Sequence, residues 1–244
     1  MNLILLSPSD LIPNTSRVLL TGRRQAHVRE VHRAAAGDVL IVGMENGKVG
    51  EGRILRLTAR EVEMEVRFLS DPPAKIPVIL CVALMRPPVF KRVLQTAATM
   101  GVEEIHVIHT QRVEKSFWQS TAIKGVSIQE QLVLGLEQAR DTVIPGVMFH
   151  KRFKPFVEDV LPGLLKGRQG IVADPAGDLI RGHTLNSKDE LSVCPRKVLL
   201  VGPEGGFIPH EITKFRDAGC RVAGLGPRIL RVETAVTSLL ARSA

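Results

Sequence analysis

The sequence has few cysteines, few aromatic residues and no long apolar run, and each shortage excludes a class of protein. Its three cysteines, Cys81, Cys194 and Cys220, form no CxxC pair, which argues against a disulfide framework and a zinc site. Aromatic residues make up 4% of the 244 residues, with no tyrosine, so a single-strand binder built on stacked aromatic platforms is disfavoured. The longest apolar run, Val78 to Met85, is too short to span a bilayer.

Targeting and metal-binding patterns are also missing. No basic region precedes the apolar N-terminal residues and no small-residue cleavage site follows them, so we expect no secretory signal. With so few cysteines, this predicts a reduced cytoplasmic protein without a membrane partner. We expect no metal site either, because the histidines lack metal-ligand spacing. The histidines considered are His106, His109, His150, His183 and His210.

Positive charge is what the sequence has in excess. Its net charge is +8 and its pI about 9.8, which favours a polyanionic partner such as RNA or DNA. Many basic proteins bind no nucleic acid, so charge alone leaves this open. The excess is uneven: residues 1–73 hold ten Lys/Arg against nine Asp/Glu, and the remainder holds 23 against 16.

The first 72 residues are predicted to form a small β-barrel. An apolar run covers Asp38 to Met44, Asn46-Gly47 is a turn signal, and alternating apolar residues follow from Val62 to Phe68. Apolar residues at helical spacing predict a helix over Arg23 to Ala36. The Asp71-Pro72-Pro73 segment breaks this pattern and is the expected linker.

Residues 73–244 alternate between strand and helix patterns, which predicts an α/β domain with a mostly parallel sheet covered on both faces. Strands are expected at 78–85, 104–109, 147–150, 170–173, 198–201 and 221–225. Helices are expected at 89–100, 127–140, 156–166, 209–218 and from 231 onward, with Pro162 kinking or splitting the third.

Three of these strand ends are rich in glycine and proline. They are residues 173–177 (Ala-Asp-Pro-Ala-Gly), 202–207 (Gly-Pro-Glu-Gly-Gly-Phe) and 224–231. One such segment would be an ordinary strand-to-helix turn, but three in succession predict a shared small-molecule site, because ligands bind at the carboxyl ends of parallel strands. Neither a Gly-Lys-Ser/Thr phosphate loop nor an early GxGxxG fingerprint is present, so nucleoside triphosphate and dinucleotide sites are unsupported.

The last two of these segments resemble a known family. Gly202-Pro203-Glu204-Gly205-Gly206-Phe207, followed by the run from Leu225 to Ala235, is similar to the C-terminal signature of the RsmE-type 16S rRNA uridine-N3 methyltransferases of the SPOUT superfamily. The resemblance extends over nearly the whole chain. Weaker matches are Val93-Leu94-Gln95, Gly101-Val102, Arg112, Glu137 to Arg140, Pro145, His27, Val31, Arg33 and Gly37-Asp38.

Some positions depart from the family pattern. Val232 stands where the family usually has Thr, and Arg86-Pro87-Pro88 stands where it has Lys-Gly-Asp. Thr96 and Thr99 replace a Lys and a Glu of the first helix. These changes leave the expected cofactor pocket intact, but no RNA contact is carried over from that helix.

The resemblance implies a fold, a cofactor and a reaction. It implies a PUA-like RNA-binding barrel over residues 1–72 and a SPOUT domain with a deep trefoil knot over residues 73–244. It also implies S-adenosylmethionine (SAM) as cofactor, N3 methylation of a specific uridine in 16S rRNA, and a homodimer acting on the small ribosomal subunit. The cofactor-binding residues it implies are Ala173, Leu200, Gly202, Pro203, Glu204, Gly205, Gly206, Leu225, Gly226, Pro227, Ile229, Leu230, Arg231, Thr234 and Ala235.

Catalytic candidates follow from the chemistry that this resemblance implies. N3 of a neutral uracil carries a proton, so the site must remove it or stabilise the resulting anion. Arg140 and Arg231 are candidates to stabilise the anion, and Glu233 or Glu204 to act as base. Equally, Glu233 and Arg140 would complement the dipoles of the helices beside them.

Expected RNA contacts and rival functions complete the sequence predictions. The RNA-docking candidates are Arg17, Arg23, Arg24, Arg29 and Arg33, although a run of arginines is often only a solvated face. One rival is a SPOUT enzyme acting on another rRNA or tRNA base or on a ribose 2′-hydroxyl. The other is a non-catalytic RNA-binding ribosome-assembly protein.

Overall fold

The computed structural model describes residues 2–179 and 196–243, so His183 and Cys194 lie outside the described residues. The chain forms two compact units. The first contains Met1–Ala74 and Val133–Ile144, and the second contains Lys75–Leu132 and Pro145–Ala244. The first unit therefore includes a segment from the middle of the chain, which a sequence division after residue 72 does not anticipate.

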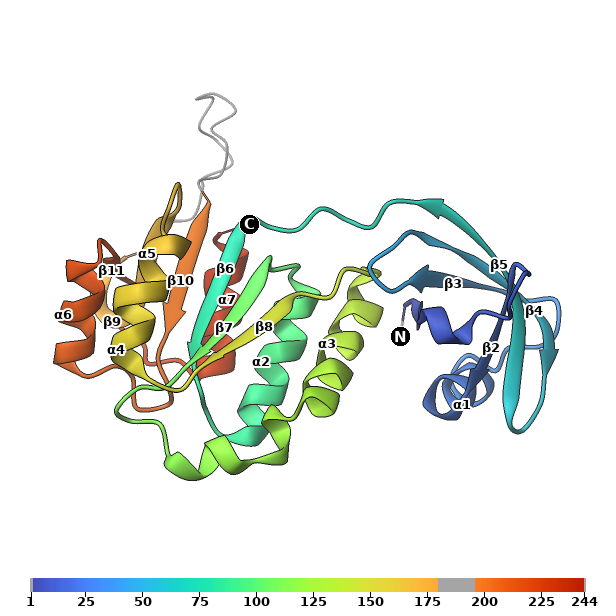
Figure 1. Cartoon of the computed structure of the whole chain (residues 1–244), viewed down its shortest axis with the longest axis horizontal. Coiled ribbons are helices and arrows are strands. Elements are labelled where there is room, and N and C mark those ends of the chain that lie inside the picture. Colours follow the sequence, from blue (N-terminus) through green and yellow to red (C-terminus); the bar gives the residue numbers. More distant parts are fainter. Residues whose placement is uncertain (1, 180–195, 244) are drawn as a thin grey trace. The chain divides into compact units, whose positions relative to one another are not determined.

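The first unit is built on a five-stranded sheet of order β1-β3-β4-β5-β2 (Figure 1). Only the β1–β3 pair is parallel. Asn46 adopts a left-handed φ of 55° in the turn between β3 and β4, as its Asn-Gly signal predicts. The strands are β1 (Ile4–Leu6), β2 (Arg17–Thr21), β3 (Val39–Met44), β4 (Val49–Leu57) and β5 (Glu61–Ser70), with a short 3-10 helix at Pro8–Asp10.

The core of the first unit comes from alternate positions of these strands. Val18 and Leu20 of β2 face Val62 and Met64 of β5, and all four are fully buried. The one helix of this region is shorter than predicted. Helix α1 covers Gly22–Glu30 rather than reaching residue 36, because the chain leaves helical geometry and Arg33 adopts a left-handed φ of 52°.

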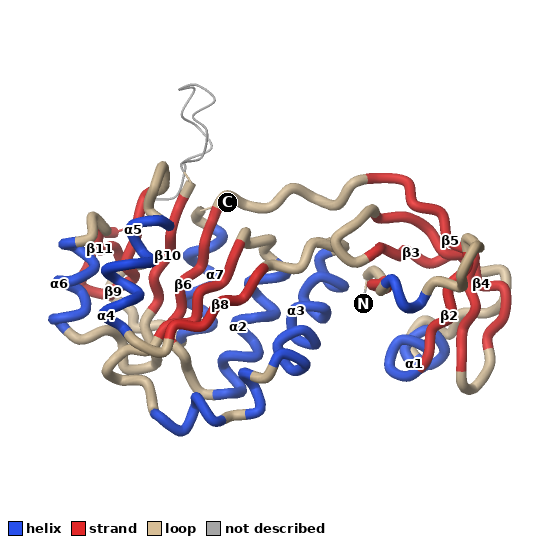
Figure 2. Tube along the Cα trace, viewed as in Figure 1, coloured by secondary structure: helices blue, strands red, loops and turns tan. Residues whose placement is uncertain are grey.

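The second unit is built on a six-stranded sheet of order β11-β9-β10-β6-β7-β8, and every pairing is parallel (Figure 2). The prediction of a parallel α/β sheet is confirmed. All residues of β6 and β10 are buried, as a strand covered on both faces requires. The strands are β6 (Val78–Ala83), β7 (Glu104–Ile108), β8 (Gly146–His150), β9 (Gln169–Leu179), β10 (Lys197–Val201) and β11 (Arg221–Gly224).

Helices lie on both faces of this sheet. In Figure 1, α4 (Phe153–Pro155) and α5 (Leu161–Leu164) lie in front of it and α7 (Val232–Ala241) lies behind it. The predicted helix over 156–166 is split, as Pro162 suggested: a π turn at Phe156–Val160 joins α4 to α5. The other helices are α2 (Pro87–Thr99), α3 (Gly125–Ala139) and α6 (Pro209–Asp217), and 3-10 turns lie at Lys115–Gln119 and Thr121–Ile123. None of the described helices is long and apolar enough to cross a bilayer.

Strand β9 differs from the prediction, which ended it at Ala173. Its pairing with β11 jumps from Val172 to Asp178 and then continues, so the intervening residues loop out within the strand. Asp174 stabilises this bulge, because its Oδ1 accepts a hydrogen bond from the backbone of Ala176 (2.8 Å). The segment is therefore a bulge that returns to the sheet rather than a strand-to-helix turn.

Candidate functional site

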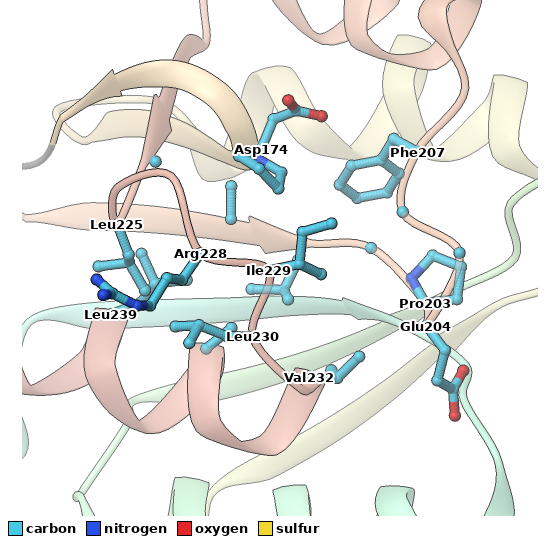
Figure 3. Close-up of a pocket in the computed structure, with 18 of the residues that line it drawn as sticks. Asp174, Pro203, Glu204, Phe207, Leu225, Arg228, Ile229, Leu230, Val232 and Leu239 are labelled. Carbon is cyan, nitrogen blue, oxygen red and sulfur yellow. The ribbon is translucent and has the colours of Figure 1, made fainter.

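A cavity of about 310 Å³ lies beside the bulge of β9 and at the carboxyl ends of β10 and β11. Most of its lining comes from three segments: the β9 bulge, the residues that follow β10, and the residues from β11 to the start of α7 (Figure 3). In Figure 3, Asp174 and Phe207 lie on one side of it, and Leu230 and Leu239 lie on the other. The prediction that the three glycine-rich segments meet around one site is therefore confirmed.

Backbone packs against backbone where these segments cross. A Cβ atom on Gly224 would lie 2.6 Å from the carbonyl oxygen of Asp174, and one on Gly177 would lie 2.6 Å from the backbone nitrogen of Ala223. Both distances are shorter than any normal contact, so only glycine allows the β9 bulge and β11 to approach this closely. The β9 bulge and β11 therefore cross with their backbones in contact beside the cavity.

The loop over 202–207 is held by contacts from two other parts of the second unit. The Oε1 of Glu204 accepts a hydrogen bond from the backbone N–H of Arg86 at the start of α2 (3.1 Å). The guanidinium of Arg112, which follows β7, donates to the carbonyl oxygen of Gly205 and also lines the cavity. Within the loop, Gly206 has a left-handed φ of 72°.

The loop over 225–231 is much more exposed. Gly226 turns it with a φ of 112°, and Ile229, at the rim of the cavity, is 87% exposed. Arg228 also lines the cavity and makes no ion pair within residues 2–179 and 196–243. This side of the site combines an exposed apolar side chain with a cation that has no ion-pair partner among the described residues.

The cavity includes most of the predicted cofactor-binding residues but not all. Those lining it are Ala173, Gly202, Pro203, Glu204, Gly205, Gly206, Leu225, Gly226, Ile229, Leu230 and Ala235. Leu200 is fully buried within β10 and does not line it. Pro227, Arg231 and Thr234 are exposed beside lining residues without lining the cavity themselves.

The three catalytic candidates come from both units, and each is described within its own unit. Arg231 is the exposed residue before α7, between the lining residues Leu230 and Val232. Glu233 pairs with Arg92 of α2 (3.1 Å), and hydrogen bonds from its own backbone N–H and then from Arg92 lower the pKa of its carboxyl. Arg140 belongs to the first unit, where it follows α3 with a left-handed φ of 57°.

Four of the five arginines expected to bind RNA have carboxylate partners inside the first unit. Arg17 pairs with Glu63 (3.2 Å), Arg24 with Asp10 (2.6 Å) and Arg23 with Glu137 (2.9 Å). Arg29 pairs with its neighbour Glu30 (2.6 Å). The fifth, Arg33, is exposed.

Sequence reasoning missed several residues that line the cavity. Asp174, Pro175, Phe207, Gly224 and Arg228 lie inside the three segments that it singled out, so the motif signal covered them. Val201, Ala223, Val232 and Leu239 are buried residues next to those segments. Arg112 is the exception: it lies about sixty residues before the nearest of these segments, and only the three-dimensional fold places it there.

Comparison with known proteins identifies the family. Residues 72–244 match the model of the RNA methyltransferase domain. The chain belongs to this family. A relative from Treponema pallidum, "Ribosomal RNA small subunit methyltransferase E", is 25% identical over 99% of this chain and 90% of its own length.

Solved structures show the same fold. A protein from Legionella pneumophila, described as a methyltransferase and solved with bound SAM, has a TM-score of 0.75 at 23% identity and covers 98% of this chain and 95% of its own. Ribosomal RNA small subunit methyltransferase E from Neisseria gonorrhoeae, bound to S-adenosylmethionine, has a TM-score of 0.73 at 21% identity, covering 99% and 95%. At these identities the likeness establishes the fold of the family across nearly the whole chain.

Proposed function

We propose that this protein is a SAM-dependent methyltransferase that modifies N3 of a specific uridine in 16S rRNA of the small ribosomal subunit. The observation that carries the proposal is the cavity beside the β9 bulge and at the carboxyl ends of β10 and β11, walled by three glycine-rich segments in a chain of the RNA methyltransferase family. The names of its relatives support small-subunit rRNA as the substrate. The N3 position rests on the motif resemblance.

The cavity fits SAM in size and in chemistry. Its volume of about 310 Å³ lies at the lower end of the roughly 300–1,000 Å³ typical of small-molecule sites. Main-chain groups at Gly202 and Leu225 offer donors and acceptors for the polar atoms of the cofactor, and the side chains of Leu225 and Leu230 offer apolar surface to its adenine ring. When bound, SAM supplies a methyl group on a positively charged sulfur.

The residues of the chain bind, orient and prepare the acceptor. Much of the rate would come from holding the uracil ring in line at the rim of the cavity. Arg231 is our candidate to stabilise the negative charge that N3 gains when it loses its proton, because it is exposed between two lining residues. Arg140 remains a second candidate. The lowered pKa of Glu233 makes it a weak base, which favours a role in orienting Arg92. Glu204, which lines the cavity, is therefore our candidate to accept the proton that N3 loses.

We further propose that the second unit contains the trefoil knot of the SPOUT fold and that residues 1–72 act as a PUA-like barrel that docks RNA. The tight crossing of the β9 bulge and β11, where glycine is required at residues 177 and 224, supports the knot. The curved antiparallel pairing of β2 to β5 in the first unit supports the barrel. Of the five arginines predicted to contact RNA, Arg33 is the one without an ion pair among the described residues, because Arg17, Arg23, Arg24 and Arg29 already face carboxylates.

A homodimer acting in the cytoplasm completes the proposal. The apolar stripe of α7 gives no argument for a dimer, because Val236, Leu239 and Leu240 are buried inside the chain. The proposal of a dimer rests on the resemblance to the SPOUT family, and Ile229, which is 87% exposed at the rim of the cavity, is the side chain that we propose for the interface. Sedimentation of wild-type protein and Ile229→Glu tests it, with a dimer in the first and a monomer in the second expected.

Two measurements test the activity. Calorimetry with SAM should give a saturable signal, and absence of binding at millimolar cofactor would favour the non-catalytic assembly factor. Primer extension on 16S rRNA from a deletion strain should lose one reverse-transcriptase stop, because N3 methylation blocks base pairing. An unchanged stop pattern together with SAM binding would favour a SPOUT enzyme acting on a ribose 2′-hydroxyl or another RNA.

A further inference from the structure

A buried carboxylate outside the cavity joins two segments that are a hundred residues apart. Glu211 lies in the first turn of α6 and is 3% exposed. Its Oε2 accepts a hydrogen bond from the backbone N–H of Ile208 (3.0 Å), and its Oε1 accepts one from the backbone N–H of Gln111 (2.7 Å). The first bond caps α6, whereas the second reaches the turn that follows β7.

That turn places a cavity residue. The backbone N–H of Val113 donates to the carbonyl oxygen of Thr110 (3.0 Å), which closes a turn with Gln111 and Arg112 at its centre. Arg112 in turn donates to the carbonyl oxygen of Gly205 and lines the cavity. The bond from Gln111 to Glu211 therefore fixes the backbone one residue from the guanidinium that supports the 202–207 loop.

Helix capping alone does not explain why this carboxylate is buried. A cap needs one acceptor oxygen, and a carboxylate removed from water is costly unless its other oxygen is also satisfied. No ion pair within residues 2–179 and 196–243 includes Glu211, so backbone N–H groups and the positive end of α6 balance its charge. The second oxygen is used only by Gln111.

We propose that Glu211 is a positioning residue for the cofactor cavity. By holding Gln111, its carboxylate keeps Arg112 against Gly205 and so sets the wall formed by the 202–207 loop. The inference rests on the proposed function, because cofactor affinity is the main measurement.

Two variants separate this role from helix capping. Glu211→Gln keeps the size of the side chain but turns one acceptor into a donor, which cannot face an N–H group. Gln111→Pro removes only the donor to Oε1 and leaves the bond to Ile208 intact; proline is favoured at this second turn position. Glu103→Gln is the matched control, since it loses a carboxylate contact to Arg168 (2.8 Å) in the same unit without touching the cavity.

Three readouts are compared for each variant: SAM affinity by calorimetry, melting temperature, and the emission of Trp118. Trp118 is the only tryptophan, follows the same turn, and its indole donates to Nδ1 of His109 (2.8 Å), so its emission reports on this region. Glu211→Gln and Gln111→Pro should each bind SAM about tenfold more weakly and shift the Trp118 emission. Glu103→Gln should bind SAM as the wild type does.

Wild-type affinity in both Glu211→Gln and Gln111→Pro would overturn the inference. So would weakened binding in Glu211→Gln alone, which would reduce Glu211 to a helix cap. If the wild type itself fails to bind SAM, the proposed function fails instead. The Trp118 emission of the two variants then decides separately whether Glu211 holds the turn.

Discussion

The glycine residues around the cavity are required for different physical reasons. Gly224 and Gly177 are required because the chain crosses itself at backbone distance, whereas Gly206 and Gly226 are required by left-handed φ values. Gly205 belongs to neither group. A Cβ atom there would lie 3.0 Å from the Cδ of Arg112, on the cavity side of the loop.

Gly205→Val should therefore weaken cofactor binding strongly without unfolding the protein. The added side chain must displace Arg112 or enter the cavity, and overpacking of this kind costs about 1–3 kcal/mol. We expect SAM affinity to fall by up to about a hundredfold in calorimetry. Gly163→Val is the control, because a Cβ atom at Gly163 meets nothing within 4 Å. Equal affinities in the two variants would contradict the proposed pocket.

In the first unit, Glu137 shows how one buried charge depends on one partner. Its side chain is 1% exposed, burial raises the pKa of its carboxyl, and the hydrogen bond from Arg23 opposes that rise. Arg23 itself is half exposed. Its removal would leave the carboxylate without this compensating charge.

Arg23→Ala should destabilise the protein by about 2–3 kcal/mol near pH 7.5, below the roughly 3–5 kcal/mol of a fully buried pair because Arg23 is partly solvated. The pKa of Glu137 should rise further in this variant. The ionised form is the one penalised, so the loss should shrink at acidic pH, where Glu137 is protonated. Urea denaturation at two pH values measures this. Arg17→Ala, which breaks an exposed pair with Glu63, should cost about 1 kcal/mol or less at both.

At the scale of secondary-structure elements, sequence patterns correctly predicted a strand or helix when all its residues lie in the same kind of environment. Val78 to Ala83 and Val198 to Val201 are buried on both faces, so a plain apolar run was sufficient. The β9 bulge was not predictable in this way. Its residues have the composition of a loop, and only the return of Asp178 and Leu179 to pair with β11 makes them part of a strand.

Strands β7 and β8 bring together two histidines, His106 and His150, which their spacing in the sequence did not indicate. Nδ1 of His106 lies 2.9 Å from Nε2 of His150, and the two rings stack against each other. Burial lowers the pKa of both imidazoles, and His106 is only 4% exposed. For His106, the hydrogen bond to Glu104 opposes this lowering. The folded strands therefore hold a histidine pair that resists protonation.

Stability should fall as the pH drops below about 6.5, the ordinary histidine pKa. Below that pH, the histidines of the unfolded chain are protonated, whereas the folded pair takes up its protons only at lower pH. Each affected histidine therefore reduces the free energy of unfolding by up to about 1.4 kcal/mol per pH unit. Melting temperatures between pH 7.5 and 5 measure this slope. Replacing both residues, in His106→Gln/His150→Gln, should flatten it, and an unchanged slope would show that other groups control acid sensitivity. His27, whose pKa burial also lowers, remains in both proteins.

For the whole molecule, sequence could predict the parallel α/β sheet and the three segments that line the cavity, but not which charged side chains pair with each other. Residues 1–73 are nearly neutral, and the structure pairs Arg17, Arg23 and Arg24 with carboxylates. The remaining residues carry the excess, 23 Lys/Arg against 16 Asp/Glu. These ion pairs could not be predicted, because they join residues as far apart as 23 and 137 and a local sequence pattern does not indicate such contacts.

This distribution predicts where RNA affinity comes from. If the second unit neutralises phosphates, the logarithm of the affinity for 16S rRNA should fall linearly with the logarithm of salt concentration, by about 0.7 per phosphate contacted on a single strand. Four to five contacts would give a slope of roughly −3. Arg228→Gln, which removes a cation at the cavity, should reduce the slope by close to one contact, whereas Arg17→Gln should leave it unchanged because Arg17 already faces Glu63. The opposite ranking would show that RNA phosphates contact Arg17 of the first unit and do not contact Arg228.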